Sequence, residues 1–326
     1  MRTAILDLGT NTFNLLITET GAGNDTRIIL SRKEPVKLGE RGINRGEITP
    51  EAVGRGLAAI DNQMSYIRDY GIESGSIHAF ATSAIRSAAN GPEFTRTIRE
   101  KHGIDVRIIS GDREAGLIYQ GVRQAVEMGR EKHLILDIGG GSNELIIADD
   151  RQIFWKESFP LGMARLLDRF HPSDPIATEE ILSIENYISQ SLTSAIEAAM
   201  IHKPVRLIGS SGTFDTFRAL LQALNNEDPG TGRCSTSCEF SPDDFFRLYG
   251  ILIDSNASGR LEMKGMDPMR VEMIVIAGIF VNFIIRRLNI VRLIQSDFSL
   301  KEGAVIEILK QRIQPTRVQQ ELKIIF

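Results

Sequence analysis

Two short segments of the sequence combine an aspartate, glycine and a hydroxyl residue in the same order. They are Asp7-Leu-Gly-Thr-Asn-Thr12 and Asp137-Ile-Gly-Gly-Gly-Ser142. Glycine lets an anion approach the main chain, and the N–H groups of such a turn can donate to phosphate oxygens. Each segment therefore predicts a phosphate-binding turn. The candidate phosphate-binding residues are Gly9, Thr10, Asn11, Thr12, Gly139, Gly140, Gly141 and Ser142, with Ser211, Gly212 and Thr213 from a later segment.

An ordinary hairpin turn is the alternative, since Gly and Asn also serve type I′ turns. This alternative explains the second segment less well, because its three successive glycines sacrifice backbone entropy that a simple turn would keep. Asp7 and Asp137 end apolar segments, where an ionised carboxylate is costly unless it is paired or bound to a cation. A Mg²⁺ ion carried with the phosphates would supply that cation, so both aspartates are candidate metal ligands.

Glu114 is a candidate general base. It lies in Ser110-Gly-Asp-Arg-Glu114, between a predicted strand at residues 106–109 and a predicted helix. One interpretation is an acidic residue in the first turn of a helix, where the helix dipole favours it. The other is a carboxylate that positions and deprotonates a water attacking a phosphorus atom. Only the surrounding motifs distinguish the two.

The elements that must position these residues are strands alternating with helices. Short apolar or alternating runs predict strands at residues 3–7, 13–18, 134–138, 144–148 and 205–209. Apolar residues at steps of three and four predict a helix after Thr49, with Thr49 as N-cap and Pro50 in the first turn. The same spacing from Ile181 to Ile196 predicts a second helix. Such alternation is typical of an α/β protein.

An internal repeat relates the two halves of the chain. At a separation of 130 residues, Asp7 aligns with Asp137 and Thr12 with Ser142, and residues 81–83 align with 211–213. Chance similarity between two hairpins is the alternative. We predict a duplicated α/β domain with a cleft between the copies. The predicted domains are residues 1–126 and 127–302, with a final helical segment within 303–326 packing back near the first domain.

The ordered motifs resemble those of the exopolyphosphatase / guanosine pentaphosphate phosphohydrolase (Ppx/GppA) family of the actin-like ATPase superfamily. The resemblance covers nearly the whole chain and is to the short members, without the helical His/Asp-bearing domain that longer members append. It rests on Asp7-Leu-Gly-Thr-Asn-Thr-Phe, Val36-Lys-Leu-Gly39, Ala81-Thr-Ser-Ala-Ile-Arg86, Ile109-Ser-Gly-Asp-Arg-Glu-Ala115, Asp137-Ile-Gly-Gly-Gly-Ser-Asn-Glu144, Gly209-Ser-Ser-Gly-Thr213 and Ser299-Leu-Lys-Glu-Gly303.

The resemblance implies two actin-like (ribonuclease H-like) domains and Mg²⁺-dependent hydrolysis of a terminal phosphoanhydride, in polyphosphate, in pppGpp or in both. Glu114 matches the catalytic glutamate of the family, and Arg86 matches an arginine that contacts phosphate near the scissile bond. Asp137 and Glu144 match acidic residues that bind the metal and its waters, and Asp7 lies in the equivalent turn of the first domain. These roles are what the resemblance implies.

The sequence departs from the family pattern at three positions. Lys301 stands where members usually have the arginine of Leu-Arg-Glu-Gly, Lys37 replaces a frequent arginine, and Glu272 replaces the aspartate of Arg-x-Asp. Lysine cannot make the bidentate contact of arginine, so these changes bear on ligand preference. Two other functions stay open: an actin-like kinase or ATPase, and a non-catalytic sensor of guanosine penta- or tetraphosphate.

Composition excludes several classes of protein. Hydrophobic residues make up 42% and charged residues 25% of 326 residues, as in ordinary soluble domains. The formal net charge is -4, so no general positive field attracts nucleic acid or a membrane. The first residues lack the apolar run of a signal peptide, so we expect a cytoplasmic protein. A homodimer is compatible with this sequence. The apolar residues 273–285 predict a buried helix, and residues 225–242 predict a solvated loop with two unpaired thiols, Cys234 and Cys238.

Overall fold

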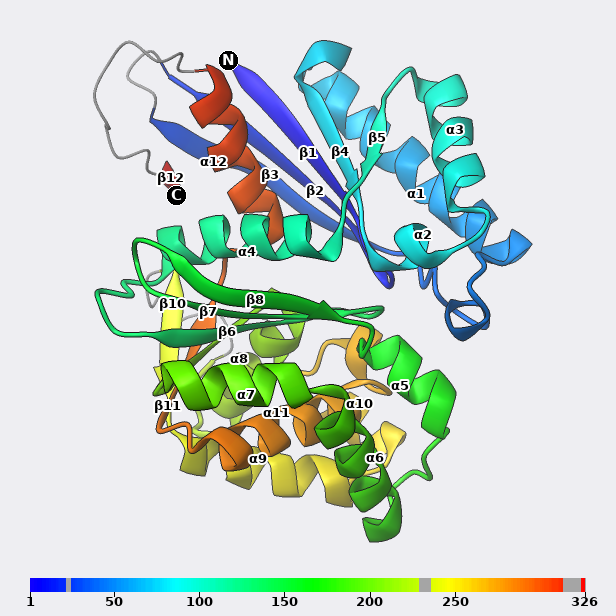
Figure 1. Ribbon diagram of the computed structural model, residues 1–326. Helices are drawn as coiled ribbons and strands as arrows, with labels where there is room; N and C mark the ends of the chain where they lie inside the picture. The colour runs from blue at the N-terminus through cyan, green and yellow to red at the C-terminus, as the bar shows by residue number, and fades with distance from the viewer. Residues whose placement is uncertain (22–24, 229–235, 313–323, 326) are drawn as a thin grey trace. The chain divides into compact units, whose positions relative to one another are not determined.

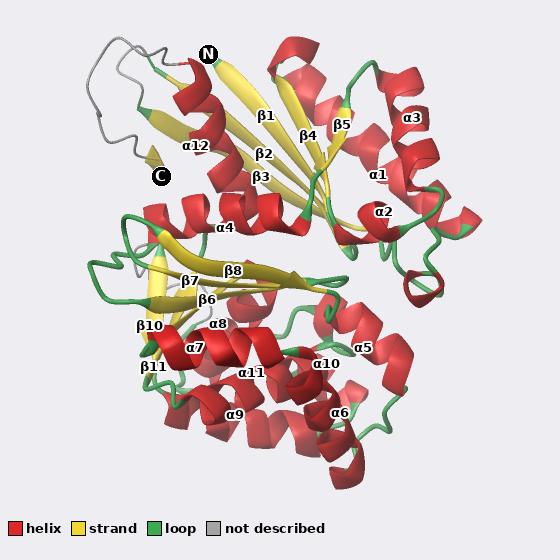
Figure 2. Cartoon of the chain, viewed as in Figure 1, coloured by secondary structure: helices red, strands yellow, loops and turns green. Residues whose placement is uncertain are grey.

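The computed structural model describes residues 1–21, 25–228, 236–312 and 324–325. Contacts within the chain divide it into two compact units. Unit 1 comprises Met1–Gln124 and Ser299–Phe326, and unit 2 comprises Ala125–Phe298. The second junction lies before the predicted residue 302, because the helix that begins at Leu300 belongs to unit 1. Figures 1 and 2 show the elements of each unit.

Unit 1 contains one sheet, in which the described strands follow the order β12-β3-β2-β1-β4-β5. β1, β4 and β5 are parallel, whereas β1, β2 and β3 form an antiparallel meander. The strands are β1 (Arg2–Leu8), β2 (Thr12–Thr20), β3 (Thr26–Pro35), β4 (Ile77–Ala81), β5 (Val106–Ile108) and β12 (Ile324–Ile325). The helices are α1 (Pro50–Asp69), α2 (Ser83–Ser87), α3 (Gly91–His102), α4 (Gly111–Ala125) and α12 (Leu300–Arg312), with 3₁₀ turns at Ile43–Arg45 and Ser74–Ser76.

The two faces of this sheet follow from strand alternation. Leu6 and Leu8 of β1 join a buried cluster with residues of α1 and α3. Ile5 is equally buried but lies outside that cluster, on the face where α12 contacts β1. The predicted cap of α1 is confirmed, because Thr49 Oγ1 accepts from Ala52 N at 3.3 Å and Pro50 is the first helical residue.

α12 packs against α4 through two glycines. A Cβ atom on Gly121 would overlap Ser299 O, and a Cβ atom on Gly303 would overlap Leu117 O. The two helix backbones therefore approach more closely than any larger residue would allow. Arg113 on α4 and Glu307 on α12 form an ion pair on the same contact.

Unit 2 repeats the strand arrangement. Its described strands follow the order β10-β11-β9-β6-β7-β8, so β6, β7, β8, β9 and β11 take the places of β1, β2, β3, β4 and β5. The strands are β6 (His133–Ile138), β7 (Asn143–Ala148), β8 (Ile153–Phe159), β9 (Arg206–Ser210), β10 (Ser237–Phe240) and β11 (Arg292–Ser296). The helices are α5 (Met163–Phe170), α6 (Thr178–Ser191), α7 (Thr193–His202), α8 (Ser211–Leu224), α9 (Pro242–Asp254), α10 (Ala257–Glu262) and α11 (Ile274–Leu288), with a 3₁₀ turn at Pro268–Arg270. The predicted α/β fold with two copies of an actin-like domain is confirmed.

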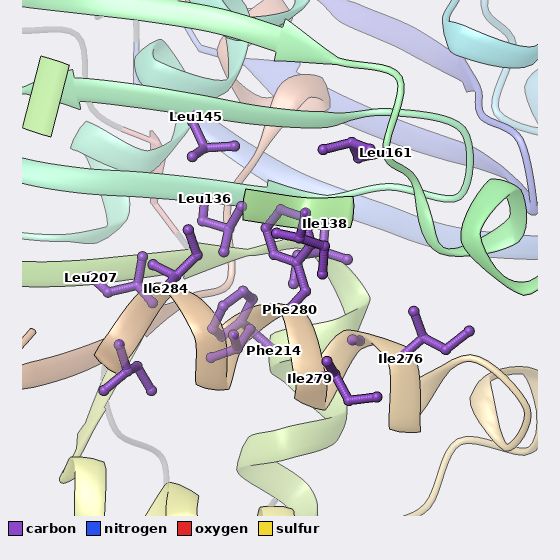
Figure 3. Close-up of a cluster of buried hydrophobic side chains, with 14 of the residues drawn as sticks. Leu136, Ile138, Leu145, Leu161, Leu207, Phe214, Ile276, Ile279, Phe280 and Ile284 are labelled. Carbon is purple, nitrogen blue, oxygen red and sulfur yellow. The ribbon is translucent and has the colours of Figure 1, made fainter. Parts of the chain in front are cut away.

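The core of unit 2 lies between one face of its sheet and α11 (Figure 3). Leu136 and Leu145 of the sheet are buried in one cluster with Phe280 and Ile284 of α11. The prediction that residues 273–285 form a buried helix is confirmed. No helix in the described ranges is long and apolar enough to cross a membrane.

Two local predictions are wrong. The helix predicted from Ile181 to Ile196 is interrupted at Leu192, which separates α6 from α7. Residues 237–240, predicted as loop, form strand β10, which pairs antiparallel with β11 and contains Cys238. Pairing with a distant strand outweighs the polar local sequence there. Cys234 lies outside the described residues.

Candidate functional site

In each unit most candidate residues lie at or just after the carboxyl ends of parallel strands. In unit 1 the first glycine turn follows β1, Arg86 lies in α2 after β4, and Glu114 lies in α4 after β5. Because these three strands are parallel neighbours, their carboxyl ends lie on one edge of the sheet. This edge is the usual ligand-binding edge of open α/β sheets.

The first turn is closed by one backbone bond. Gly9 N donates to Thr12 O at 3.1 Å, and a Cβ atom on Gly9 would lie only 2.8 Å from the same oxygen. Only glycine fits at this point of the turn. Asp7 accepts from Asn14 Nδ2 at 2.9 Å, from the position directly opposite on β2. The turn thus holds one carboxylate with an amide donor.

Glu114 is a buried carboxylate with a cationic partner. Its exposed fraction is 7%, and its Oε2 accepts from Arg86 Nη1 at 2.7 Å. The same Nη1 donates to Ile109 O at 3.1 Å, which anchors the guanidinium to the end of β5. Ser110 Oγ caps α4 by accepting from Arg113 N at 3.1 Å. Glu114 does lie in the first turn of α4, but a residue placed there for the helix dipole alone would need neither burial nor an arginine.

The second turn is closed by the same kind of backbone hydrogen bond as the first, and residues of α5 hold it in addition. Gly139 N donates to Ser142 O at 3.1 Å, and a Cβ atom on Gly139 would lie 2.5 Å from that oxygen. The carbonyls of the three glycines are bound by the first turn of α5. The bonds are Met163 N to Gly139 O at 3.0 Å, Ala164 N to Gly140 O at 2.8 Å and Arg165 Nε to Gly141 O at 2.8 Å.

This support leaves the N–H groups of Gly140 and Gly141 for a ligand. Neither N–H donates to any acceptor in the described part of the chain. Gly162 makes the contact with α5 possible, because a Cβ atom there would overlap the Gly140–Gly141 peptide. A rigid turn with fixed carbonyls and unsatisfied donors suits an anion.

Asp137 and Glu144 form a carboxylate pair beside the second turn. They lie directly opposite on β6 and β7, with exposed fractions of 7% and 2%. Ser210 Oγ donates to Asp137 Oδ2 at 2.6 Å. Ser142 Oγ and Ser158 Oγ donate to Glu144 Oε1 at 2.7 and 2.6 Å. The Ser142 hydroxyl, predicted as a phosphate donor, therefore donates to Glu144 in this structure.

The pair fits a magnesium ion that arrives with phosphate. Mg²⁺ prefers oxygen ligands and is usually held by one or two protein carboxylates plus substrate phosphates and water. Asp137 and Glu144 supply two such carboxylates on adjacent strands. Within the described ranges, no group of three or more His, Cys, Asp or Glu side chains could hold a metal by itself. Asp7, the third predicted metal ligand, lies in unit 1.

The third predicted phosphate segment begins α8 and is joined by an arginine that the sequence analysis did not assign to the site. Ser211 has a left-handed backbone with φ of +71° and donates from Oγ to Ile138 O at 3.0 Å. The guanidinium of Arg270 lies over Gly212, where a Cβ atom would overlap Nη2. Its Nε lies 3.3 Å from Asp267 Oδ2.

Arg270 places positive charge near the second turn. Burial lowers the pKa of Arg270 from its ordinary value, and the charges of Asp267, Asp215 and Asp137 oppose that shift. The Arg270-Val-Glu motif was visible in the sequence, but its contact with Gly212 joins residues far apart along the chain. Only the fold brings them together.

The chain resembles known proteins over nearly its whole length. Residues 16–312 match the Ppx/GppA phosphatase family. An exopolyphosphatase structure from Cytophaga hutchinsonii is 36% identical, with a TM-score of 0.91 over 95% of this chain and 98% of the other. "Exopolyphosphatase 1" of Mycobacterium leprae is 26% identical over 98% of this chain and 93% of its own. The Aquifex aeolicus Ppx/GppA family member shares the fold, at 22% identity and a TM-score of 0.78 over 97% of this chain and 99% of its own. By sequence and by fold, the chain belongs to the Ppx/GppA phosphatase family.

Proposed function

We propose that this protein is a Mg²⁺-dependent exopolyphosphatase, which hydrolyses the terminal phosphoanhydride bond of linear polyphosphate and releases orthophosphate. Membership of the Ppx/GppA phosphatase family supports this proposal, as do the names of the relatives from C. hutchinsonii and M. leprae. The same bond ends guanosine pentaphosphate, which we propose as a second substrate.

The observation that carries the proposal is the buried ion pair between Glu114 and Arg86. Hydrolysis of a phosphoanhydride needs a group that orients a water molecule and takes its proton. A carboxylate held by an arginine 2.7 Å away has a fixed orientation, which is what positioning a water requires. A protein that only bound the ligand would need phosphate contacts but no proton acceptor.

The proposed reaction is an in-line displacement. The oxygen of water attacks the terminal phosphorus, its proton passes to Glu114, and the bond from phosphorus to the bridging oxygen breaks. The products are orthophosphate and a chain one phosphate shorter. When bound, Mg²⁺ supplies positive charge that stabilises the phosphate oxygens in the transition state. Asp137 and Glu144 would hold the ion, and the N–H groups of Gly140 and Gly141 would bind phosphate oxygens.

A substrate panel tests the proposal. Phosphate release is measured from tripolyphosphate, long polyphosphate, guanosine pentaphosphate and ATP, each with Mg²⁺ and with EDTA. We expect Mg²⁺-dependent release from polyphosphate that exceeds release from ATP. Transfer of phosphate from ATP to an acceptor, without hydrolysis of polyphosphate, would identify an actin-like kinase instead. Tight binding of guanosine tetraphosphate with no hydrolysis of any substrate would identify a sensor.

A further inference from the structure

Four side chains form a row across the sheet of unit 2. The register places Glu144 of β7 opposite Asp137 of β6 in the centre of this row. Ser158 of β8 lies opposite Glu144, and Ser210 of β9 lies opposite Asp137. Residues directly opposite one another on neighbouring strands share one face of a sheet. The row therefore has two carboxylates in the middle and one hydroxyl at each end.

Each outer serine donates to the carboxylate next to it. Ser158 Oγ donates to Glu144 Oε1 at 2.6 Å, and Ser210 Oγ donates to Asp137 Oδ2 at 2.6 Å. Like charges directly opposite on adjacent strands are destabilising, and burial adds to the cost of a charge. A hydroxyl carries no charge, so it orients a carboxylate without cancelling the negative charge that attracts a cation. The row thus keeps two oriented carboxylates side by side.

Further hydrogen bonds hold the strand ends that carry the two serines. Asn143 Nδ2 of β7 donates to Leu161 O at 3.0 Å, just beyond the end of β8. Ser211 Oγ donates to Ile138 O at 3.0 Å and joins the residue after β9 to the end of β6. The strand ends of both serines are therefore tied to the strands of both carboxylates. Such support keeps the hydroxyls in place before any ligand binds.

The matching row of unit 1 shows that outer hydroxyls are not a requirement of the fold. There Asp7 of β1 lies opposite Asn14 of β2. Phe80 of β4 and Lys33 of β3 take the outer positions, where unit 2 has its serines. The same strand arrangement thus accepts an aromatic ring and a lysine at these positions. The two hydroxyls accompany the carboxylate pair of unit 2 rather than the fold.

We propose that Ser158 and Ser210 are positioning residues for the Mg²⁺ site, which set the affinity of Asp137 and Glu144 for the ion. The inference rests on the proposed function for the presence of that ion. Hydrogen bonds to metal-binding carboxylates tune metal affinity, and the loss of such a partner typically costs about 10- to 100-fold. Neither serine needs to touch the metal or the phosphate for this role.

A purely structural role is the alternative, since buried carboxylates need hydrogen-bond donors in any case. Loss of a serine would then lower the melting temperature and leave metal affinity unchanged. Metal binding therefore has to be measured directly and without substrate. Mn²⁺ serves as the probe, because electron paramagnetic resonance follows its unbound fraction during a titration. Melting temperatures are measured in EDTA.

The test uses Ser158→Ala and Ser210→Ala, with Ser158→Thr as the variant that keeps a hydroxyl. Threonine suits a strand, and Ser158 is only partly buried. The matched control is Ser194→Ala, which removes another bond from a serine to a carboxylate in the same unit. Ser194 Oγ donates to Glu157 Oε2 at 2.7 Å, and Glu157 precedes Ser158 and so points to the opposite face of β8.

We expect Ser158→Ala and Ser210→Ala each to bind Mn²⁺ about tenfold or more weakly than wild type. Ser158→Thr and Ser194→Ala should each stay within about twofold of wild type, because both keep the row of hydroxyls and carboxylates intact. A loss in Ser158→Ala that threonine restores would identify the hydroxyl as the cause, rather than a change in packing.

Wild-type Mn²⁺ affinity in either alanine variant of the row would overturn the role of that serine. An equal loss in Ser194→Ala would overturn both roles, and so would a wild-type protein that binds no Mn²⁺. A loss in Ser158→Thr as large as in Ser158→Ala would overturn the role of the Ser158 hydroxyl.

The proposed function has a separate readout, which is phosphate release with Mg²⁺. Wild-type protein that binds Mn²⁺ through these serines but releases no phosphate would contradict that function and leave the positioning role standing.

Discussion

Arg86 Nη1 lies 2.7 Å from Glu114 Oε2, across 28 residues of sequence. The two residues lie in helices that follow β4 and β5, which are neighbouring parallel strands. The orientation of the carboxylate therefore depends on the packing of two elements rather than on its own helix. A group held in this way can accept a proton without a large rearrangement at the moment of reaction.

Glu114→Gln keeps the size of the side chain and removes its ability to take a proton. We expect turnover of polyphosphate to fall by about 10² to 10⁴, with little change in affinity. The control is Glu51→Gln, which changes an exposed glutamate in the first turn of α1 and should leave turnover unchanged. Phosphate release and calorimetric binding measure the two quantities. Wild-type turnover in Glu114→Gln would show that Glu114 serves only the helix terminus.

Asp137→Asn removes one charge from the carboxylate pair while leaving an acceptor for Ser210. We expect the Mg²⁺ concentration for half-maximal activity to rise, and the affinity for polyphosphate measured with Mg²⁺ to fall, by about tenfold or more. Glu144→Gln should change both quantities in the same direction. Asp254→Asn, at an exposed carboxylate of the same unit, provides the control. An unchanged Mg²⁺ dependence in both site variants would place the metal elsewhere.

Gly303→Ala tests the contact between α4 and α12. The added Cβ atom would overlap Leu117 O, and we expect destabilisation of unit 1 by about 1–3 kcal/mol. Gly54→Ala is the matched control, because Gly54 lies within α1 and its Cβ position has no neighbour within 4 Å. Alanine should stabilise that helix by roughly 0.5–1 kcal/mol. Urea unfolding of the two variants should move in opposite directions, and a shift in the same direction would show that α12 can move aside.

The burial of the His133 imidazole predicts that the protein loses stability at low pH. The side chain is fully buried, its Nε2 bonds to Met128 O at 2.7 Å, and its Nδ1 has no hydrogen-bond partner among the described residues. Burial lowers the pKa of His133, partly opposed by the Met128 carbonyl. The unfolded chain then binds more protons than the folded one as the pH falls below about 6.5.

The contribution of neutral His133 to the free energy of unfolding therefore has its full value above about pH 7. This contribution decreases as the pH falls from about 6.5 to the lowered pKa of the folded state. For one proton the slope reaches at most about 1.4 kcal/mol per pH unit. The measurement is the free energy of unfolding between pH 5 and 8 for wild type and His133→Asn. The variant should have the shallower profile in the acidic range. Parallel profiles would mean that His133 does not titrate differently in the two states.

The duplicated fold could be predicted because its signals are local. Each copy carries its own aspartate, glycines and alternating strands within a few residues, so the repeat is visible in the sequence. The Thr49 cap of α1 and the buried helix α11 also follow from short-range patterns. The break at Leu192 was missed because the apolar spacing continues through it, and spacing records which face is buried but not whether the helix axis is continuous.

The contacts that shape the candidate site were harder to predict. Arg270 over Gly212 and Ser158 beside Glu144 are long-range contacts, and nothing in either local sequence indicates its partner. The two copies also differ in chemistry at matching positions. Asp7 faces Asn14 across its strands, whereas Asp137 faces Glu144, a difference that became meaningful once the strand register was known.

The path of the chain through the two units affects the order in which they can be completed during synthesis. Unit 2 is one continuous segment, Ala125–Phe298, whereas unit 1 also needs α12, which is synthesised after unit 2. Unit 2 can therefore finish folding on the ribosome while the face of the first sheet that α12 contacts is still open. During that interval the apolar strand residues on that face, such as Ile5, stay exposed, and the docking of α12 ends it.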